Sequence, residues 1–235
     1  MNFATSVRPC RLVALASLVC SLTATAVAQD AAPAQPATPP APSAPVYVAM
    51  TTNKGVIVLE LNAEKAPLSV ANFVAYAKSG FYDGTVFHRV IKGFMVQGGG
   101  FTADLKQKTP NPPIKNEWRN GLPNARGTIA MARTSVADSA TSQFFINTVD
   151  NRMLDQPRDG AAYAVFGKVV KGMEVVDAIA GTPTGISAGM RDVPTTSVTI
   201  EKVEILSKKP DIDEAPKAPA TGEPAPATPA SSTGS

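Results

Sequence analysis

The chain has 235 residues, of which 44% are hydrophobic and 17% are charged, and its formal net charge is +3. Such a chain is too apolar to be disordered throughout and too short for several large domains. The near-neutral balance of charge also argues against a nucleic acid or an anionic membrane as its partner. Of the 21 prolines, six lie in 33–45 and six in 210–229, so the segment 46–208 between them can hold one sizeable core.

The N-terminus has the pattern of a secretory signal. Two arginines precede an apolar run over 12–19, and the Ala-Val-Ala tripeptide at 26–28 is a small-x-small cleavage site. We therefore predict a signal peptide over 1–28. An uncleaved anchor is the alternative, although the apolar run is short for a membrane span. Both cysteines, Cys10 and Cys20, lie in this segment, so the mature chain would have none.

Two segments of low complexity flank the central part. Residues 29–45 are Ala or Pro at 12 of 17 positions, and residues 209–235 have a similar composition. Such sequences have little to bury, so we predict a disordered spacer and a disordered tail.

The central part begins with two predicted strands, 46–52 and 56–61. Asn-Lys-Gly at 53–55 between them is a hairpin signal. A helix is predicted to begin at Pro67, because a proline loses no hydrogen bond in the first turn of a helix. Helical spacing gives it one apolar stripe, made of Val70, Phe73, Val74 and Ala77. Gly80 is the predicted stop.

Short strands separated by glycine-rich turns follow this helix. They are predicted over 85–91, 95–98, 128–132, 144–146 and 165–170. A second helix is predicted over 173–180 and a last strand over 197–206, where the alternation slips after Ile200 and indicates a bulge. About eight strands with only two helices predict a mainly β fold, a closed eight-stranded antiparallel β-barrel capped by two α-helices. A βαβ fold would need a helix between most strands.

Several familiar motifs are absent or incomplete. Residues 185–189 match G-x-S-x-G, but prolines flank them and the only histidine, His88, lies upstream, so a loop is predicted there instead of a hydrolase elbow. With one histidine and no mature cysteine, no Cys/His metal site is predicted. The glycines at 98–100 are not followed by Gly-Lys-Ser/Thr, so they predict a strand end with close backbone approach and not a phosphate loop.

Three apolar clusters carry the informative residues. From residue types alone, each could simply be a core strand. Together they resemble the cyclophilin family of peptidyl-prolyl isomerases: FHRVIKGFMVQGG at 87–99 and SQFFI at 142–146 are similar to its two signatures, and AVFGKVVKGMEVVD at 164–177 to its closing segment. The resemblance runs in order through 46–206 and is strongest to the periplasmic cyclophilins of Gram-negative bacteria.

The resemblance implies an isomerase domain over 46–208 with an eight-stranded barrel and a helix at each end. It implies no cofactor and no metal. The implied partners are proline-containing unfolded or partly folded polypeptides, and the protein is expected to be a periplasmic monomer that has no membrane contact after signal cleavage.

The same resemblance implies roles for individual residues. Arg89 aligns with the catalytic arginine and Gln97 with the amide that binds the substrate backbone. The proline-ring pocket is implied to consist of Phe94, Met95, Phe145 and Leu154, and the neighbouring groove to include Ala132 and Gln143. Met153 and Tyr163 are also implied to bind substrate. Met153, Tyr163 and Arg133 stand where the family commonly has Trp, His and Asn, which puts tight cyclosporin binding in doubt. Trp118 lies outside these motifs and is given no site role.

The chemistry of proline isomerisation suits this set of residues. The barrier to peptide rotation is roughly 18–20 kcal/mol, and in the twisted transition state the proline nitrogen gains a lone pair. A hydrogen-bond donor that can meet this lone pair only in the transition state lowers the barrier, and the Arg89 guanidinium is such a donor. His88 would point to the opposite strand face, so we predict a structural role for it.

Two alternative functions remain open at this point. The same pocket could belong to a proline-peptide binding module or holdase with little turnover, or the barrel could be purely structural. The tails also contain six Ala-Pro pairs, which could compete with substrate as tethered ligands. A plain spacer is the favoured interpretation of the tails.

Overall fold

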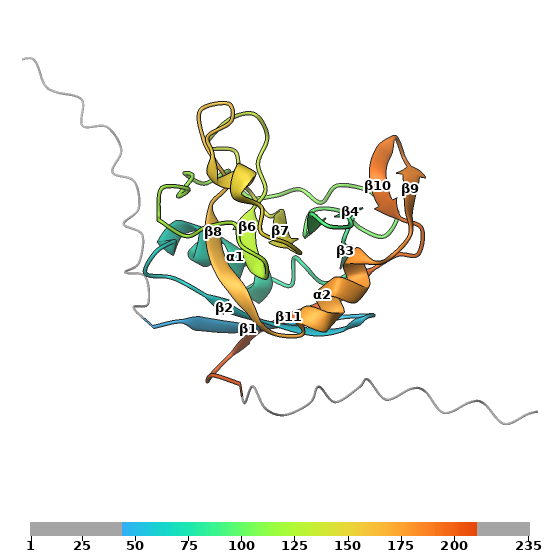
Figure 1. The fold of residues 1–235 in the computed structure, drawn as a ribbon. Helices are drawn as coiled ribbons and strands as arrows, with labels where there is room; N and C mark the ends of the chain where they lie inside the picture. The colour runs from blue at the N-terminus through green and yellow to red at the C-terminus, as the bar shows by residue number, and fades with distance from the viewer. Residues whose placement is uncertain (1–43, 211–235) are drawn as a thin grey trace, which may run out of the picture. The chain divides into compact units, whose positions relative to one another are not determined.

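The computed structural model describes residues 44–210 (Figure 1). The predicted signal peptide over 1–28 lies outside these residues, as do nearly all of the spacer over 29–45 and nearly all of the tail over 209–235. Within 44–210, none of the helices combines the length and the apolarity that a membrane crossing requires.

Nine antiparallel strands form the main sheet, in the order β3-β11-β1-β2-β8-β6-β7-β5-β4. The strands are β1 Val46–Thr52, β2 Gly55–Leu61, β3 Thr85–Val86, β4 Arg89–Ile91, β5 Met95–Gly98, β6 Thr128–Met131, β7 Phe144–Asn147, β8 Val165–Lys171 and β11 Thr199–Leu206. Two helices, α1 Pro67–Lys78 and α2 Met173–Ala180, accompany the sheet, and a short 3-10 helix, η1, covers Arg152–Asp155.

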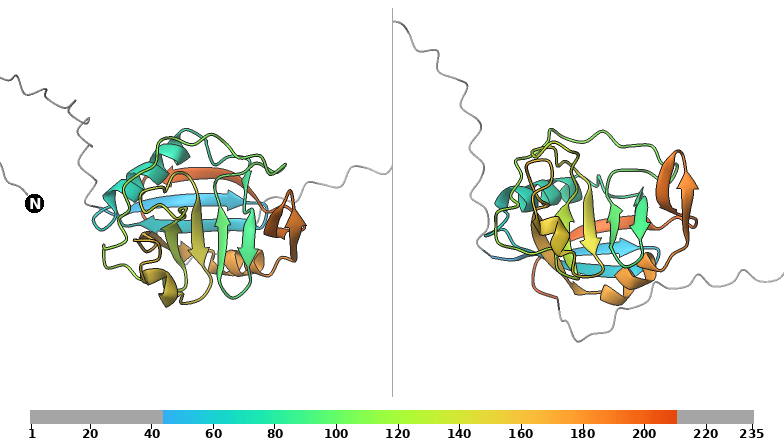
Figure 2. Two further views of the ribbon diagram at one scale, coloured as in Figure 1. Left: turned by 90° about the horizontal axis from the view of Figure 1, so that it is seen from above. Right: turned by 45° about the horizontal axis from the view of Figure 1, so that its top comes forward.

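The prediction of a closed eight-stranded barrel is wrong, because the sheet is an open, strongly curled half-barrel (Figures 1 and 2). Its two edges are β3 and β4, and no ladder joins them within the described residues. They come from the single strand predicted over 85–91, which is broken at Phe87. The Phe87 N–H bonds to the Val198 carbonyl at 2.9 Å, and its buried ring packs edge-on against Phe144. The chain therefore passes from one edge to the other without pairing them.

The first hairpin and the bulge in the last strand are confirmed. Thr52 faces Gly55 across β1 and β2, so only two residues form the turn. In the β1–β11 pair, Thr51 faces Lys202 while Thr52 faces Ile200. Glu201 is thus the extra residue of a bulge that lies directly after Ile200, where the alternation slips.

Both helices lie where the sequence predicts them. Helix α1 begins at Pro67 and buries Val70, Phe73 and Ala77, but Val74 is only partly buried and Tyr76 is buried in addition. Figure 2 shows the two helices on opposite sides of β1, β2 and β11. Helix α1 packs on β11, whereas α2 packs against β2, β4 and β5, so the helices cover the two openings of the half-barrel.

A separate hairpin replaces the loop predicted around 185–189. It consists of β9 Thr184–Ser187 and β10 Met190–Pro194, and it stands beside β4 apart from the main sheet (Figures 1 and 2). Because a strand and not a helix follows Ser187, the strand–turn–helix context of a hydrolase elbow is absent at this place.

Candidate active site

The half of the sheet formed by β4, β5, β7, β6 and β8 carries apolar residues on both faces. One face packs into the main core through Val90, Val96, Ile129 and Ile146. The other face carries a smaller cluster made of Met95, Ala130, Phe145 and Val165. Successive side chains of a strand point to opposite faces, so each strand contributes to both. The smaller cluster forms the floor of the candidate site.

Strand register brings the polar site residues next to this floor. Arg89 faces Gln97 across β4 and β5, and Gln97 faces Phe145 across β5 and β7. Directly opposed residues of an antiparallel pair point to the same face, with Cβ atoms about 5 Å apart. An arginine, an amide and an aromatic ring therefore stand in one row, although they are far apart in sequence.

A pocket of about 300 Å³ opens on this row. It is lined by Arg89, Phe94, Met95, Gln97, Ala132, Arg133, Phe145, Leu154 and Tyr163. Eight of the ten predicted site residues are thus brought together, with Arg133 in addition. Gln143 joins them through Gln97, whose Nε2 donates to Gln143 Oε1 at 3.0 Å. Met153 is not brought to the pocket. Its neighbour Leu154 lines the pocket, whereas Met153 is 72% exposed to solvent.

The glycines at 98–100 allow the Gln143 side chain to approach the backbone. A Cβ atom at Gly100 would lie 2.5 Å from Gln143 Cγ, and one at Gly99 would lie 2.7 Å from the Phe144 ring. Gly99 also has a φ of +81°, which side chains rarely tolerate. The predicted close approach is confirmed, and its purpose here is to make room for Gln143.

One wall of the pocket is held by Arg133. Its guanidinium lies over the Tyr163 ring at 4.9 Å, and Tyr163 meets Phe145 edge-on with ring centroids 5.5 Å apart. Arg133 also donates hydrogen bonds to the carbonyls of Thr134, Arg158, Ala161 and Ala162. These acceptors are all neutral carbonyls, so the bonds fix the guanidinium in place without neutralising its charge.

A buried asparagine network, which sequence reasoning missed, supports the other walls. Asn151 Nδ2 donates to the Phe94 carbonyl at 2.8 Å and to Asn147 Oδ1 at 2.7 Å. Asn147 in turn donates to Asn124 Oδ1 at 3.2 Å. Buried amides are kept only where partners satisfy them, so the network fixes the backbone that carries the pocket residues.

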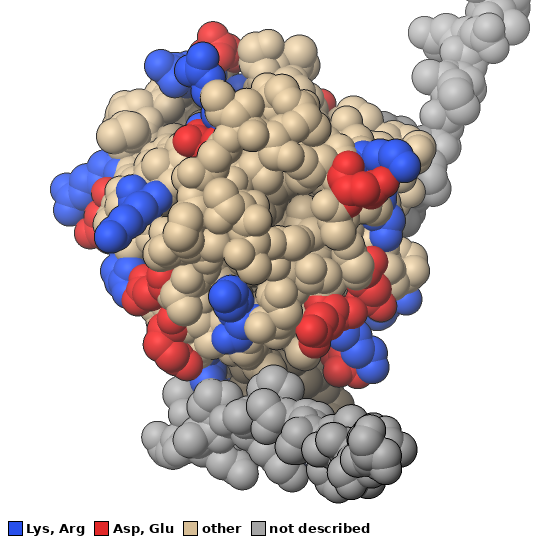
Figure 3. Space-filling model, turned by 90° about the vertical axis from the view of Figure 1, so that its right-hand side faces the viewer, with Lys and Arg blue, Asp and Glu red and all other residues tan. Residues whose placement is uncertain are grey.

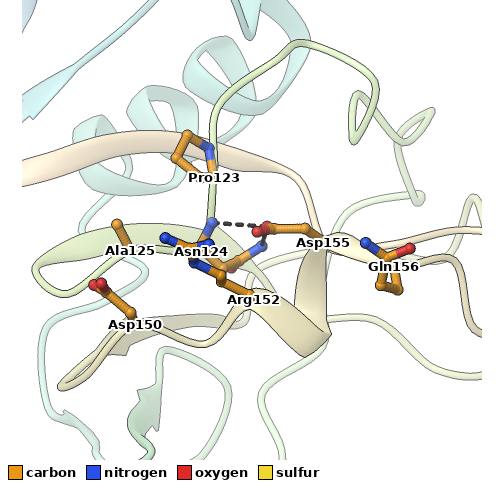
Figure 4. A pocket seen from close by; sticks show the side chains of 7 residues that line it. All are labelled: Pro123, Asn124, Ala125, Asp150, Arg152, Asp155 and Gln156. Carbon is orange, nitrogen blue, oxygen red and sulfur yellow. Dashed lines mark hydrogen bonds between the residues drawn. The ribbon is translucent and has the colours of Figure 1, made fainter.

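The network continues under η1. Asn124 donates from its backbone N–H and from Nδ2 to Asp155 Oδ1, at 2.7 and 2.8 Å (Figure 4). A second hollow of about 350 Å³ adjoins this contact. Asp155 follows Leu154 directly, so the contact holds η1 and with it Leu154. The available signal was local: asparagines placed beside the apolar motifs, as Asn147 is beside SQFFI.

His88 is buried and does not line the pocket. The pKa of His88 is lowered to about 4, chiefly by burial and also by the neighbouring positive charge of Arg89, against hydrogen bonding to Val86 and Gln143. The imidazole is therefore neutral at pH 7. Its ring packs against Phe101 at 4.5 Å, while within residues 44–210 its Nδ1 has no hydrogen-bond partner.

Comparisons with known proteins identify relatives over most of the described chain. The family model for cyclophilin type peptidyl-prolyl cis-trans isomerase/CLD matches residues 47–205. Peptidyl-prolyl cis-trans isomerase A of Dickeya dadantii is 58% identical over 162 residues, which are 69% of this chain and 85% of that protein. Peptidyl-prolyl cis-trans isomerase B of Escherichia coli is 53% identical over 161 residues, 67% of this chain and 98% of that protein.

Solved structures show the same fold. A cyclophilin type peptidyl-prolyl cis-trans isomerase from Cryptosporidium parvum has a TM-score of 0.58 at 27% identity, covering 70% of this chain and 99% of its own. The same protein crystallised in the presence of the dipeptide Ala-Pro has a TM-score of 0.57, at 27% identity and with 69% and 99% of the two chains covered.

Proposed function

The chain belongs to the cyclophilin-type peptidyl-prolyl cis-trans isomerases, and from that premise we propose that Arg89 catalyses rotation about Xaa-Pro bonds of exported polypeptides in the pocket of about 300 Å³. The observation that carries the proposal is the shared pocket of Arg89 and Gln97 over the apolar floor of Met95 and Phe145. Proline ring, prolyl nitrogen and adjoining backbone each have a partner there.

The floor and walls bind the proline ring. Met95 and Phe145 are almost fully buried, and Leu154 and Tyr163 close the sides. An apolar ring that enters this pocket is removed from water and held in one orientation. Gln97 lies beside the ring site, and its Nε2 bond to Gln143 fixes the direction of its amide. The free oxygen of this amide can then hold the substrate backbone.

Arg89 acts on the nitrogen. As the peptide bond twists, conjugation is lost and the prolyl nitrogen becomes an acceptor, which it is not in either planar isomer. A guanidinium N–H that meets this acceptor binds the transition state and not the ground states, so it lowers the barrier. Arginine retains its proton throughout, and no covalent or acid–base step is required.

The biological role we propose is to speed slow folding steps of exported proteins. Uncatalysed isomerisation takes tens to hundreds of seconds and can limit folding. Support for export comes from the signal pattern of 1–28, whose cleavage would release the mature chain into the periplasm. The sequence 29–45 would then be a spacer before the isomerase domain of 46–208. Sequencing the N-terminus of the protein recovered from periplasm should give Gln29, whereas a retained Met1 would contradict cleavage.

The central experiment compares Arg89→Ala with the wild type on an Ala-Pro peptide. Cis–trans exchange should slow by about 100-fold or more at the variant, because one transition-state donor is removed. Peptide affinity, measured separately by titration, should change little, because Arg89 is not part of the apolar floor. Wild-type exchange rates in the variant would overturn the role of Arg89.

The same experiment separates the isomerase from a holdase. A holdase would bind the peptide with little exchange in either protein, so Arg89→Ala would have no rate to remove. The relatives favour the enzyme, because they are named peptidyl-prolyl cis-trans isomerases.

A further inference from the structure

Arg89 has a carboxylate partner that comes from outside the main sheet. Its Nε lies 3.7 Å from Oδ2 of Asp192, a residue of β10. We propose that Asp192 is a positioning residue for the isomerase reaction: it holds the guanidinium by its Nε edge and leaves both terminal nitrogens for the pocket. The inference rests on the role proposed for Arg89.

The backbone around Asp192 is built to aim this side chain. In the β9–β10 hairpin, Met190 faces Ser187 but Val193 already faces Gly185, so Arg191 and Asp192 stand opposite a single residue. This is a β-bulge, and bulges redirect side chains, often beside active sites. Asp192 also has a φ of +62°, a conformation that is strained for most residues with a side chain but tolerated by aspartate.

The bulge is fixed at its C-terminal side. Val193 and Pro194, which follow Asp192, are buried, and Thr195 donates to the Pro183 carbonyl at the base of the hairpin from its backbone N–H at 2.9 Å. Strand β10 packs beside β4, which carries Arg89. Asp192 thus lies between this fixed base and the tip of the hairpin, which is formed by Ala188 and Gly189. A free loop end would not hold a carboxylate in one place.

The contact is suited to orientation and not to stability. The side chains of Arg89 and Asp192 are 43% and 40% exposed, and ion pairs so open to water contribute little to folding. A long arginine side chain otherwise samples many rotamers, and only some of them present an N–H to the prolyl nitrogen. Holding the side chain before substrate arrives makes the donor preorganised, which acts on the transition state.

The surface around the hairpin does not offer a simpler explanation through bulk charge. Figure 3 views the side of the molecule that carries β9 and β10, and acidic and basic side chains lie near one another there. No single sign gathers on this face of the described chain. The effect of Asp192 is therefore expected to be local to Arg89.

The test measures kcat and KM separately for an Ala-Pro peptide with full-length wild type, Asp192→Ala and Asp192→Asn. We expect Asp192→Ala to lower kcat 3- to 10-fold while KM stays within twofold and the melting temperature is unchanged. Asp192→Asn should lower kcat about as much, because the 3.7 Å contact is an ion pair beyond hydrogen-bond range and the amide carries no charge. Asp177→Asn is the control: Asp177 pairs with Arg126 at 2.7 Å with similar exposure, neither residue lines the pocket, and kcat should stay unchanged.

A double-mutant cycle separates failure of this inference from failure of the proposed function. In an Arg89→Ala background, Asp192→Ala should have no further effect on kcat. Wild-type kcat in Asp192→Ala, or an equal loss with and without Arg89, would overturn the positioning role. If instead Arg89→Ala itself kept wild-type exchange, the proposed function of Arg89 would fail first.

Discussion

The side-chain amide of Gln97 donates to that of Gln143 at 3.0 Å, and this bond links β5 to the segment that enters β7. The Gln143 side chain lies directly over the backbone of Gly100. Substrate recognition by Gln97 is therefore expected to depend on a glycine that does not line the pocket.

Gly100→Ala tests this dependence. The new Cβ would lie 2.5 Å from Gln143 Cγ, so Gln143 must move and its bond to Gln97 is lost. We expect KM for an Ala-Pro peptide to rise about threefold to tenfold, in line with about 1 kcal/mol for one hydrogen bond. Gly181→Ala is the control, because its Cβ would meet other atoms only at ordinary distances. An unchanged KM in Gly100→Ala would show that Gln143 does not orient Gln97.

Asn151→Ala tests the asparagine network. The change removes donors to the Phe94 carbonyl and to Asn147 in a buried site, so the free energy of unfolding should fall by about 2 kcal/mol. For a chain of this size the melting temperature should fall by roughly 4–8 °C. Thermal unfolding followed by circular dichroism measures both.

Asn53→Ala is the control for that variant. Asn53 also makes two hydrogen bonds, to Ser197 and from Thr199, but these are exposed, so water can replace them. Equal losses of stability in the two variants would contradict a special cost of the buried network.

Stability should depend on His88 at acid pH. The pKa of His88 is lowered from 6.5 to about 4, so between these values the unfolded chain binds more protons than the folded one. The free energy of unfolding should therefore fall by up to about 3 kcal/mol as the pH drops from about 6.5 to about 4. Urea unfolding of wild type and His88→Gln across this range should give a difference that changes with pH. A difference that stays constant would refute the assignment, and isomerase activity of the variant should remain mostly intact at pH 7.

Arg133→Ala should loosen one wall of the pocket. The variant lacks the hydrogen bonds from Arg133 to the carbonyls of Arg158, Ala161 and Ala162, so amide hydrogen exchange in 158–163 should quicken. Because Tyr163 also loses the guanidinium over its ring, KM should rise about threefold. Arg158→Ala removes a charge from the same loop while keeping the carbonyl, and it should change neither quantity. If both variants behaved alike, charge and not the bonding of Arg133 would be responsible.

Local patterns in the sequence determined most of the helices and strands. The start at Pro67, the hairpin turn after Thr52 and the slip after Ile200 depend on neighbouring residues only, and the structure has each of them. Family resemblance supplied the pocket residues, and strand alternation explains why Met95, Gln97 and Phe145 share one face. Met153 was misplaced, because a one-turn helix presents adjacent residues in different directions.

Only the tertiary structure decided how distant segments meet. Whether β3 and β4 close a barrel depends on the bend at Phe87, and that bend is fixed by the Val198 carbonyl more than 100 residues away. The asparagine network and the pairing of Arg89 with Asp192 likewise join segments that no local period relates. Strand alternation and turn chemistry act over a few residues, whereas these contacts arise when distant segments pack together. The sequence alone therefore determined the parts of the site, and the fold determined how they are held.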